Sequence, residues 1–283
     1  MHNHCPDRPV FSIIIPTLNR PDMLRRALRS VMNQTYQAFE VIVVDDGSEL
    51  ELRAADLIDP GWRQKVTIVR NERSLGAAAA RNRGIRAACG EYVSFLDDDD
   101  EFFPDFLEKT AMVLSGTPES IGFSWTNVKF INDAGSRSVM RGKEFREDYA
   151  SDEELVFEAT SIGTGFGVTV KRACFAKVGY FDPSLRFVED TEFFIRLLAS
   201  GLRPVLVKTF GVCIHNHDLD RLTSTEKYPQ RLVECDLLME KHEDFLNRHQ
   251  RVLARLSMVK TAIHRRIVRT RQREAVRQRW GTG

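Results

Sequence analysis

The sequence of 283 residues lacks several features that define common protein classes. No apolar run approaches the roughly 18 residues that a membrane-spanning helix needs. Residues 1–8 have no apolar core, which argues against a secretory signal. The five cysteines include no Cys-x-x-Cys pair, and their odd number and wide spacing argue against a disulfide framework or a zinc ribbon. These absences favour a protein of the reducing cytoplasm.

The composition is that of an ordinary globular protein, with 42% hydrophobic and 29% charged residues. This balance excludes the disordered, collagen and coiled-coil classes. The net charge of +1 conceals an asymmetry, because residues 251–283 hold ten Arg or Lys and one acidic residue. That segment carries +9, which leaves −8 for residues 1–250. An acidic body and a basic tail favour two different partners.

Short apolar runs alternate with helical patterns over the first hundred residues. The patterns predict strands over 11–15, 39–44, 65–69 and 92–96, and helices over 21–31, 49–58, 75–89 and 104–114. This alternation, with its near-continuous Ile and Val runs, is typical of a parallel sheet covered by helices on both faces. Ligands bind such sheets beyond the carboxyl ends of the strands. We therefore expect a site built from residues 16–19, 45–48 and 97–100.

The pattern changes after residue 120. We expect strands over 121–131, 168–171 and 205–214, a helix over 191–199, a polar loop with a short helix over 137–160, and helix from residue 228 onward. The glycine-rich segment 163–167 precedes a strand instead of opening a helix, so it is not a dinucleotide fingerprint. Close packing of its backbone against a neighbouring element is the expected role.

Four consecutive aspartates, residues 97–100, follow the fourth predicted strand. Protons, solvent or a cation must offset their mutual repulsion. One interpretation is a solvated acidic turn that caps the next helix. The other is a site for Mg²⁺ or Mn²⁺, because these hard cations bind carboxylates together with substrate phosphates. The acidic pair Asp45 and Asp46 ends another strand at the same edge, which favours the cation site.

Seven segments, taken in order, resemble family 2 glycosyltransferases. They are residues 12–19, 30–35, 40–48, 76–82, 90–100 with Pro104, 178–182 and 189–196. The resemblance spans about residues 10–224. It implies an α/β fold of the GT-A type, which is a Rossmann-like, mostly parallel central sheet flanked by helices. It also implies inverting transfer from a nucleotide sugar.

The resemblance further implies how the chain is divided. A GT-A catalytic domain would cover residues 8–224, with a donor half over about 8–115 and an acceptor half over about 116–224. A helical, basic C-terminal extension would cover residues 225–283. The glycine-rich segment 163–167 would then pack on the acceptor side.

Donor-binding roles follow from the matched positions. Pro16, Thr17 and Asn19 would line the pocket of the nucleotide base. Asp46 matches the aspartate that contacts a uracil or thymine ring. Arg81 matches a basic position near the donor, and its alternative is a solvated arginine on a helix.

The aspartate run matches the Asp-x-Asp motif of the family. Asp97 would face the ribose, and Asp99 would bind Mn²⁺ or Mg²⁺ on the diphosphate. Many relatives have a small residue where this chain has Asp98, which we assign to the donor side. Which of the three carboxylates bind the metal stays open.

Catalysis would fall to Asp190, which matches the family's general base. Sugar transfer needs such a carboxylate to take the proton of the attacking hydroxyl. From the residues alone, the favoured interpretation of Asp190 is a carboxylate just before a helix, where the helix dipole stabilises it. Glu189 and Glu192 would orient the acceptor or the base. His217, with His215 next in preference, would approach the metal or the diphosphate; the alternative is a surface histidine.

The basic tail has an apolar stripe at helical spacing: Val252, Leu256, Val259, Ile263 and Ile267. Three interpretations remain open: a helix lying on an anionic membrane, a helix packed on the catalytic domain, and helix pairing in a dimer. Nucleic acid binding is disfavoured, because Trp280 is the tail's single aromatic residue.

The expected activity is metal-dependent, inverting transfer of a sugar from a nucleoside-diphosphate sugar, with UDP or dTDP favoured. The acceptor would be a hydroxyl of a glycan or a lipid-linked glycan in surface polysaccharide synthesis. The location would be the cytoplasm, or the inner face of the membrane through the basic tail. The alternatives are a non-catalytic nucleotide-binding scaffold of a polysaccharide assembly complex and, within enzymes, nucleotidyl transfer.

Overall fold

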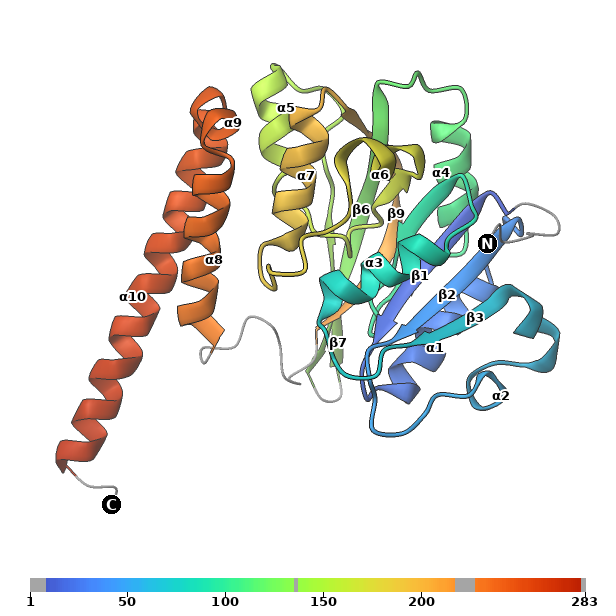
Figure 1. The fold of residues 1–283 in the computed structure, drawn as a ribbon, viewed down its shortest axis with the longest axis horizontal. Helices are drawn as coiled ribbons and strands as arrows, with labels where there is room; N and C mark the ends of the chain where they lie inside the picture. The colour runs from blue at the N-terminus through green and yellow to red at the C-terminus, as the bar shows by residue number, and fades with distance from the viewer. Residues whose placement is uncertain (1–8, 135–136, 217–226, 281–283) are drawn as a thin grey trace.

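The computed structural model describes residues 9–134, 137–216 and 227–280 (Figure 1). Its strands are β1 (Phe11–Thr17), β2 (Phe39–Asp45), β3 (Val66–Arg70), β4 (Tyr92–Phe95), β5 (Glu101–Phe102), β6 (Ile121–Ala134), β7 (Arg137–Lys143), β8 (Thr169–Lys171) and β9 (Arg203–Asn216). Its helices are α1 (Pro21–Met32), α2 (Ala54–Leu57), α3 (Ala77–Ala87), α4 (Phe106–Leu114), α5 (Asp152–Ala159), α6 (Ala173–Val178), α7 (Glu189–Ala199), α8 (Tyr228–Lys241), α9 (Glu243–Arg248) and α10 (Gln250–Trp280).

The strands of these described ranges form one sheet in the order β3-β2-β1-β4-β8-β6-β9-β5, with β7 paired to β6. The first four strands are parallel, so Ile14 lies between Ile42 and Phe95 on its neighbours. Beyond β4 the sheet is mixed, because β8 is antiparallel to both β4 and β6 while β6 and β9 are parallel. The predicted parallel sheet is therefore confirmed for β1 to β4, and the rest of the sheet is mixed.

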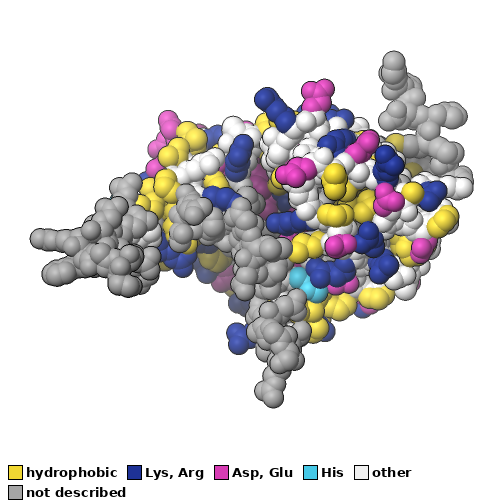
Figure 2. All heavy atoms as spheres, turned by 90° about the horizontal axis from the view of Figure 1, so that it is seen from below, with side chains coloured by type: hydrophobic (Ala, Val, Ile, Leu, Met, Phe, Trp, Pro, Cys, Tyr) yellow, Lys and Arg dark blue, Asp and Glu magenta, His cyan; other side chains and the backbone are white. Residues whose placement is uncertain are grey.

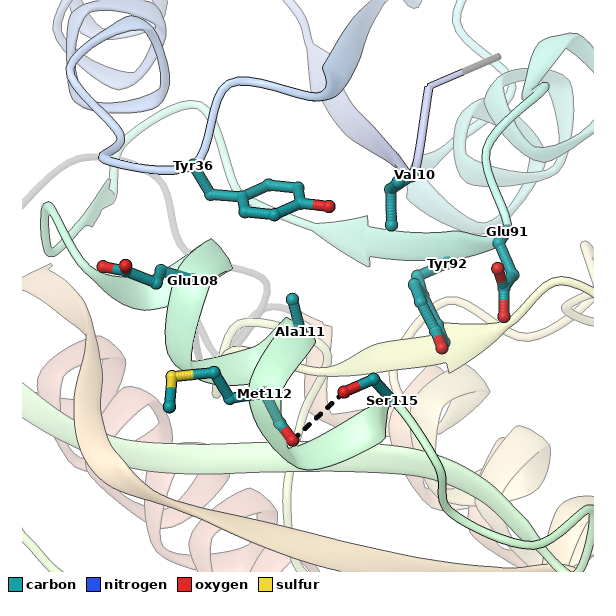
Figure 3. Close-up of a pocket in the computed structure, with 8 residues that line it drawn as sticks. All are labelled: Val10, Tyr36, Glu91, Tyr92, Glu108, Ala111, Met112 and Ser115. Carbon is teal, nitrogen blue, oxygen red and sulfur yellow. Dashed lines mark hydrogen bonds between the residues drawn. The ribbon is translucent and has the colours of Figure 1, made fainter.

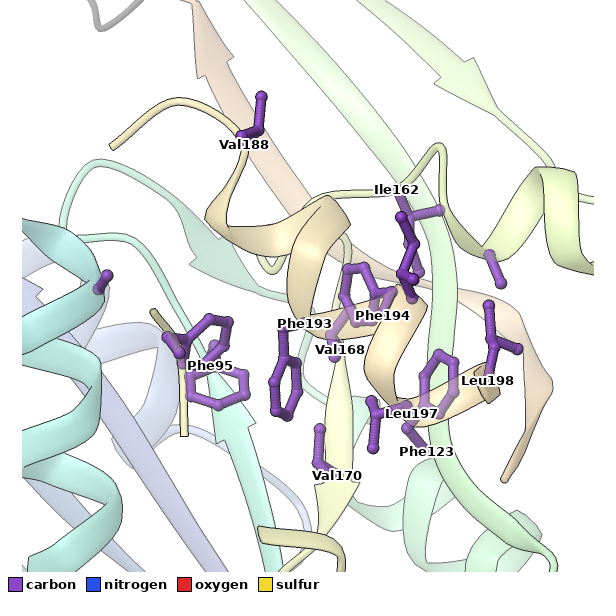
Figure 4. Packing of buried hydrophobic residues seen from close by; sticks show 14 of the residues in the cluster. Phe95, Phe123, Ile162, Val168, Val170, Val188, Phe193, Phe194, Leu197 and Leu198 are labelled. Carbon is purple, nitrogen blue, oxygen red and sulfur yellow. The ribbon is translucent and has the colours of Figure 1, made fainter. Parts of the chain in front are cut away.

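Helices cover both faces of the sheet, as strand alternation requires. Ile13 and Ile15 of β1 point into an apolar cluster with α1 and α4, and Ile14 points into a second cluster with α3 and α7. Figure 4 shows Phe193 and Phe194 of α7 packing toward the strands in this second cluster. The rings of Phe194 and Phe123 stack with their centroids 5.5 Å apart.

Two predicted segments differ from the structure. The helix expected over 49–58 is reduced to α2: Leu57 and Ile58 are buried, but Leu50, near the start of the expected helix, is 82% exposed. The polar loop expected over 137–160 contains β7 as well as the short helix α5. The edge strand β7 pairs on one side and is rich in basic residues, so it lacks the alternation by which a half-buried strand is recognised.

The C-terminal helices are part of the core. In Figure 1, α8 and α10 lie side by side next to α5 and α7, and α10 continues past α8. Val252, Leu256 and Ile263 of the predicted apolar stripe are buried in the same cluster as α7. Packing of the stripe on the catalytic domain is therefore confirmed. No helix in the described ranges is long and apolar enough to cross a bilayer.

The cysteines differ in state. Cys174, Cys213 and Cys235 are buried thiols, whereas Cys89 is disulfide-bonded. A bond at Cys89 is not the framework of several disulfides that the cysteine spacing argues against.

Candidate active site

The carboxyl ends of β1, β2 and β4 meet at one edge of the sheet, as predicted. Pro16 lies opposite Val44 of β2. The hydroxyl of Thr17 donates to Oδ2 of Asp98 at 2.6 Å, and the carbonyl of Thr17 accepts from the backbone N–H of Asp46 at 2.9 Å. The three segments that the sequence assigned to the site are thus in direct contact.

Asn19 joins the loop after β1 to the loop after β2. Its backbone N–H donates to Oγ of Ser48 at 2.9 Å, and its Oδ1 accepts from the N–H of Glu49 at 2.8 Å. Its φ of 57° lies in the left-handed region, which Asn tolerates better than most residues. The two loops therefore form one bonded unit beside the aspartate run.

Asp46 is buried, and its carboxylate is engaged by the chain itself. It accepts hydrogen bonds from Asn71 Nδ2 at 2.7 Å, from Ser74 Oγ at 2.8 Å and from the N–H of Gly76 at 2.9 Å. The N–H of Leu75 donates to it as well. Asp46 therefore anchors the loop that opens α3, and its contact with a nucleotide base stays a prediction.

The aspartate run has more negative charge than its neighbours offset. Burial raises the pKa of Asp98 to about 6, although Thr17 and Arg20 act against the shift. Burial, together with Asp97 and Asp99, raises the pKa of Asp100 to about 9. Burial and repulsion from Asp99 also raise the pKa of Asp97 above its ordinary value, against the pull of Arg81. Burial is the largest cause of all three shifts, and repulsion between the aspartates adds to it.

Arg81 connects the carboxyl end of β4 to the first turn of α7. Its side chain is about 5% exposed, so the alternative of a solvated helix arginine is wrong. Its guanidinium lies 3.0 Å from Oδ1 of Asp97, 3.2 Å from Oε1 of Glu189 and 3.7 Å from Oδ1 of Asp190. Burial alone would lower the pKa of Arg81, but these three carboxylates raise it. The cation is therefore permanent.

Asp190 lies inside the first turn of α7, not before the helix. Its Oδ2 accepts from the N–H of Thr164 at 2.9 Å and faces the hydroxyl of Thr164 at 3.4 Å. Oδ1 is buried and has no hydrogen bond within the described residues. Oδ2 is thus held in place by Thr164, and Oδ1 can still accept a proton.

The glycine-rich segment 163–167 packs closely against these carboxylates. A Cβ atom at Gly163 would lie 3.2 Å from Oδ2 of Asp190, and one at Gly165 would lie 3.3 Å from Oδ2 of Asp97. At Gly167, where φ is +64°, a Cβ would overlap Thr126 Oγ1 at 2.4 Å. The prediction of close backbone packing is confirmed.

Glu192 is not part of this group. Its carboxylate is completely buried on the other side of α7, where it accepts from Arg196 Nε at 2.9 Å and contacts His242 Nε2 at 3.1 Å. Burial alone would raise its pKa, but His242, Arg196 and Lys241 lower the pKa of Glu192 to about 2. The expectation that Glu192 orients the acceptor or the base is not supported by any contact to Asp190 in the described residues.

The two predicted histidines are placed differently. His215 Nε2 lies 2.8 Å from Oε1 of Glu101, and the N–H of His215 donates to Asp100 at 3.0 Å. His217 lies outside the described residues. The sequence reasoning missed Arg20 and Thr164, which hold Asp98 and Asp190. Arg20 directly follows the base-pocket loop, a signal that could have identified it.

A divalent cation fits the charge of the aspartate run, although the described residues hold no group of three His, Cys, Asp or Glu side chains arranged around a metal. Oδ2 of Asp99 lies 3.2 Å from Arg20. The aspartates of the run repel one another, and this repulsion adds to burial in raising the pKa values of Asp97, Asp98 and Asp100. Oxygen ligands of this kind suit Mn²⁺ or Mg²⁺ with substrate phosphates as further ligands.

Figure 2 views the molecule from below Figure 1 and shows a hollow in which acidic and basic side chains lie next to each other. A separate cavity of about 450 Å³ is lined by Val10, Tyr36, Tyr92 and Met112 (Figure 3). Val10 and Tyr92 lie at the start of β1 and β4, so this cavity is at the opposite edge of the sheet.

Comparison with known proteins identifies the family. The family described as Glycosyl transferase family 2 matches residues 12–178, more than half of the chain. The chain belongs to glycosyl transferase family 2. The matched range of this glycosyltransferase ends before Asp190, so the role of Asp190 stays a prediction.

Two relatives illustrate the match. An uncharacterized glycosyltransferase of Haemophilus influenzae is 32% identical over 194 residues, which are 67% of this chain and 62% of that protein. The putative colanic acid biosynthesis glycosyl transferase WcaA of Escherichia coli is 28% identical over 255 residues, or 86% of this chain and 84% of WcaA. This chain thus spans less than two thirds of the first relative.

Two solved structures share the fold. The mannosyltransferase PcManGT from Pyrobaculum calidifontis, in complex with GDP-Man and Mn²⁺, has a TM-score of 0.64 and 18% identity, covering 99% of this chain and 79% of PcManGT. S. aureus TarS 1–349, in complex with UDP-GlcNAc, has a TM-score of 0.61 and 20% identity, covering 84% of this chain and 72% of TarS 1–349. At this identity the likeness concerns the fold, and the GT-A architecture is confirmed.

Proposed function

We propose that this glycosyltransferase is an inverting enzyme in which Asp190 is the general base. The supporting observation is the placement of Asp190, which lies beside Arg81 and across from the end of β4, with one oxygen held by Thr164. Inversion requires a base on the side of the sugar opposite to the leaving diphosphate. Oδ1 of Asp190 would take the proton of the acceptor hydroxyl as that oxygen attacks the sugar.

The aspartate run would hold the donor. Asp99 would hold the divalent cation, with Asp97 and Asp98 facing the nucleotide. When bound, Mn²⁺ or Mg²⁺ supplies charge stabilisation to the departing diphosphate. Arg20 and Arg81 would keep the carboxylates apart from one another and in position, because each guanidinium contacts two or more of them.

The donor would be a nucleoside-diphosphate sugar. The two solved structures are complexes with UDP-GlcNAc and with GDP-Man, which supports this donor class and leaves the nucleotide base open. The position of Asp46 in the family motif favours UDP or dTDP as the nucleotide of the donor. The acceptor would be a hydroxyl of a glycan or a lipid-linked glycan in surface polysaccharide synthesis, as the name of WcaA supports.

A thermal-shift panel tests the donor and the metal together. UDP, dTDP, GDP, CDP and ADP would each be added with Mn²⁺, with Mg²⁺ and with chelator. A ligand at about 100 times its Kd adds about 2.7 kcal/mol to the free energy of unfolding. We expect UDP or dTDP to stabilise the protein only when Mn²⁺ or Mg²⁺ is present. If no nucleotide shifts the melt with metal present, the proposed donor site is wrong.

Peripheral membrane contact is a further part of the proposal. Because the apolar stripe of α10 is packed in the core, contact would rely on charge: Arg265, Arg266 and Arg269 are exposed on the C-terminal half of α10, where Arg266 also donates to the hydroxyl of Tyr228. Basic residues near an anionic surface contribute about 1 kcal/mol each. We expect the chain to float with liposomes containing phosphatidylglycerol and not with neutral ones. Flotation that is insensitive to anionic lipid or to Arg→Gln changes at these positions would contradict this.

A further inference from the structure

The C-terminal helices contact the segment that carries Asp190. Glu234 of α8 is buried, and its Oε2 accepts from the backbone N–H groups of Arg186 and Phe187, both at 2.8 Å. These two residues directly precede the first turn of α7. Because a buried N–H without a partner is costly, Glu234 fixes the path by which the chain enters α7.

A second group of contacts reaches Glu192, which follows Asp190 in the chain. Lys241, at the end of α8, lies 2.9 Å from Oε1 of the buried Glu192, and it donates to Asp182 at 2.8 Å. His242 also contacts Glu192, at 3.1 Å. The helices thus hold the chain both before and after Asp190.

A third contact acts through the loop that bonds Asp190. Arg255 of α10 donates to the carbonyls of Phe157 at 3.1 Å and of Thr160 at 2.5 Å, where α5 ends. The chain then runs through buried Ile162 to Thr164, which donates to Oδ2 of Asp190. Arg255 therefore fixes the start of the loop that orients the carboxylate.

We infer that these four side chains, Glu234, Lys241, His242 and Arg255, form a clamp that positions Asp190 for the reaction. The inference rests on the proposed role of Asp190 and extends it to residues beyond the range that the family matches. None of the four contacts Asp190 in the described residues, so they are positioning residues. A misplacement of about 1 Å in a reacting group can lower a rate about 100-fold.

Glu234 gives the sharpest test. Glu234→Ala removes both hydrogen bonds to the loop, whereas Glu234→Gln keeps a carbonyl oxygen that can accept them. Asp236→Asn, on the exposed side of the same helix, breaks an ion pair with Lys260 and is the matched control. We expect Glu234→Ala to lower kcat about 10- to 100-fold with little change in the Kd of the nucleotide with Mn²⁺. Glu234→Gln should restore most of the kcat, and Asp236→Asn should leave it unchanged.

Hydrogen–deuterium exchange supplies a readout that is independent of activity. We expect faster exchange over residues 183–192 in Glu234→Ala, and wild-type exchange in the other two variants. Unchanged exchange, or a kcat within twofold of wild type despite faster exchange, would overturn the inference. If wild-type protein transfers no sugar from any donor, the proposed function fails, while the exchange data still decide whether the clamp holds this segment.

Discussion

Two glutamates of α7, one helical turn apart, have opposite electrostatic surroundings. Glu189 faces Arg81, which it shares with Asp190 and Asp97, and burial together with Asp190 raises its pKa. Glu192 faces Arg196, Lys241 and His242, which hold its pKa at about 2. Both side chains are buried. The difference lies in how many cations serve each carboxylate.

The same contrast separates the two acidic regions of the molecule. At the strand ends, five carboxylates share ion pairs with Arg20 and Arg81, so these two cations leave negative charge over for a ligand. At the C-terminal helices, each buried carboxylate is satisfied by cations or backbone N–H groups. Surplus negative charge therefore distinguishes the candidate catalytic region from the structural one, although both are rich in Asp and Glu.

The largest effect is expected at Asp190. Asp190→Asn removes the proton acceptor while keeping its shape, so transfer should fall by roughly 10²–10⁴-fold. Nucleotide binding should be unchanged. Asp152→Asn alters a carboxylate in the first turn of α5 and is the matched control. Turnover within a few fold of wild type in Asp190→Asn, measured as released nucleoside diphosphate, would remove this residue from its proposed role.

The structural region can be tested by pH. The pKa of Glu192 is lowered from 4.5 to about 2, so its stabilisation is complete above pH 4.5 and is lost as pH falls toward 2. The lowered pKa corresponds to about 3 kcal/mol of stabilisation of the folded protein. Glu192→Gln should lower the free energy of unfolding at pH 7 by about that amount. Its free energy of unfolding should also fall less steeply than that of the wild type as the pH decreases below 4.5. Urea unfolding of both proteins across pH 3–7 measures the difference, and an equally steep fall in both proteins would contradict the prediction.

The candidate catalytic region should respond to metal. Asp99→Ala is expected to abolish most of the roughly 2.7 kcal/mol that a nucleotide with Mn²⁺ adds at about 100 times its Kd. The melting temperature without ligands should change little, because the side chain of Asp99 is half-buried and lies in a charge-rich cluster. A nucleotide shift that survives both Asp99→Ala and chelator would mean that Asp99 binds no metal.

The smallest effect is expected at Arg20, whose guanidinium lies 3.2 Å from Oδ2 of Asp99. Arg20→Met removes the positive charge beside that oxygen, which makes the cluster of carboxylates more negative. Mn²⁺ alone should then bind a few fold more tightly, by roughly 0.5–1 kcal/mol, the value of a partly exposed ion pair. Titration calorimetry measures this, and weaker Mn²⁺ binding would show that Arg20 supports the cation site.

The sequence predicted β1, β2 and β4 well, because strands buried on both faces carry nearly continuous apolar runs. The rule that ligands bind beyond the carboxyl ends of parallel strands also predicted that Thr17 and Asp98 lie in one site. Glu192 could not be placed this way, since the partners Lys241 and His242 lie about fifty residues later. The strand β7 was missed for a related reason: an edge strand need not alternate apolar and polar residues.

The clamp also has a consequence for the order in which the chain folds. Glu192 is synthesised well before the cations of α8 that neutralise it, and Asp190 is synthesised well before the arginine of α10 that steadies its loop. Domains usually fold from the N-terminal side during synthesis. Here the acceptor half cannot complete its packing until the C-terminal helices have left the ribosome. The donor half can therefore form early, while catalytic competence depends on some of the last residues to emerge.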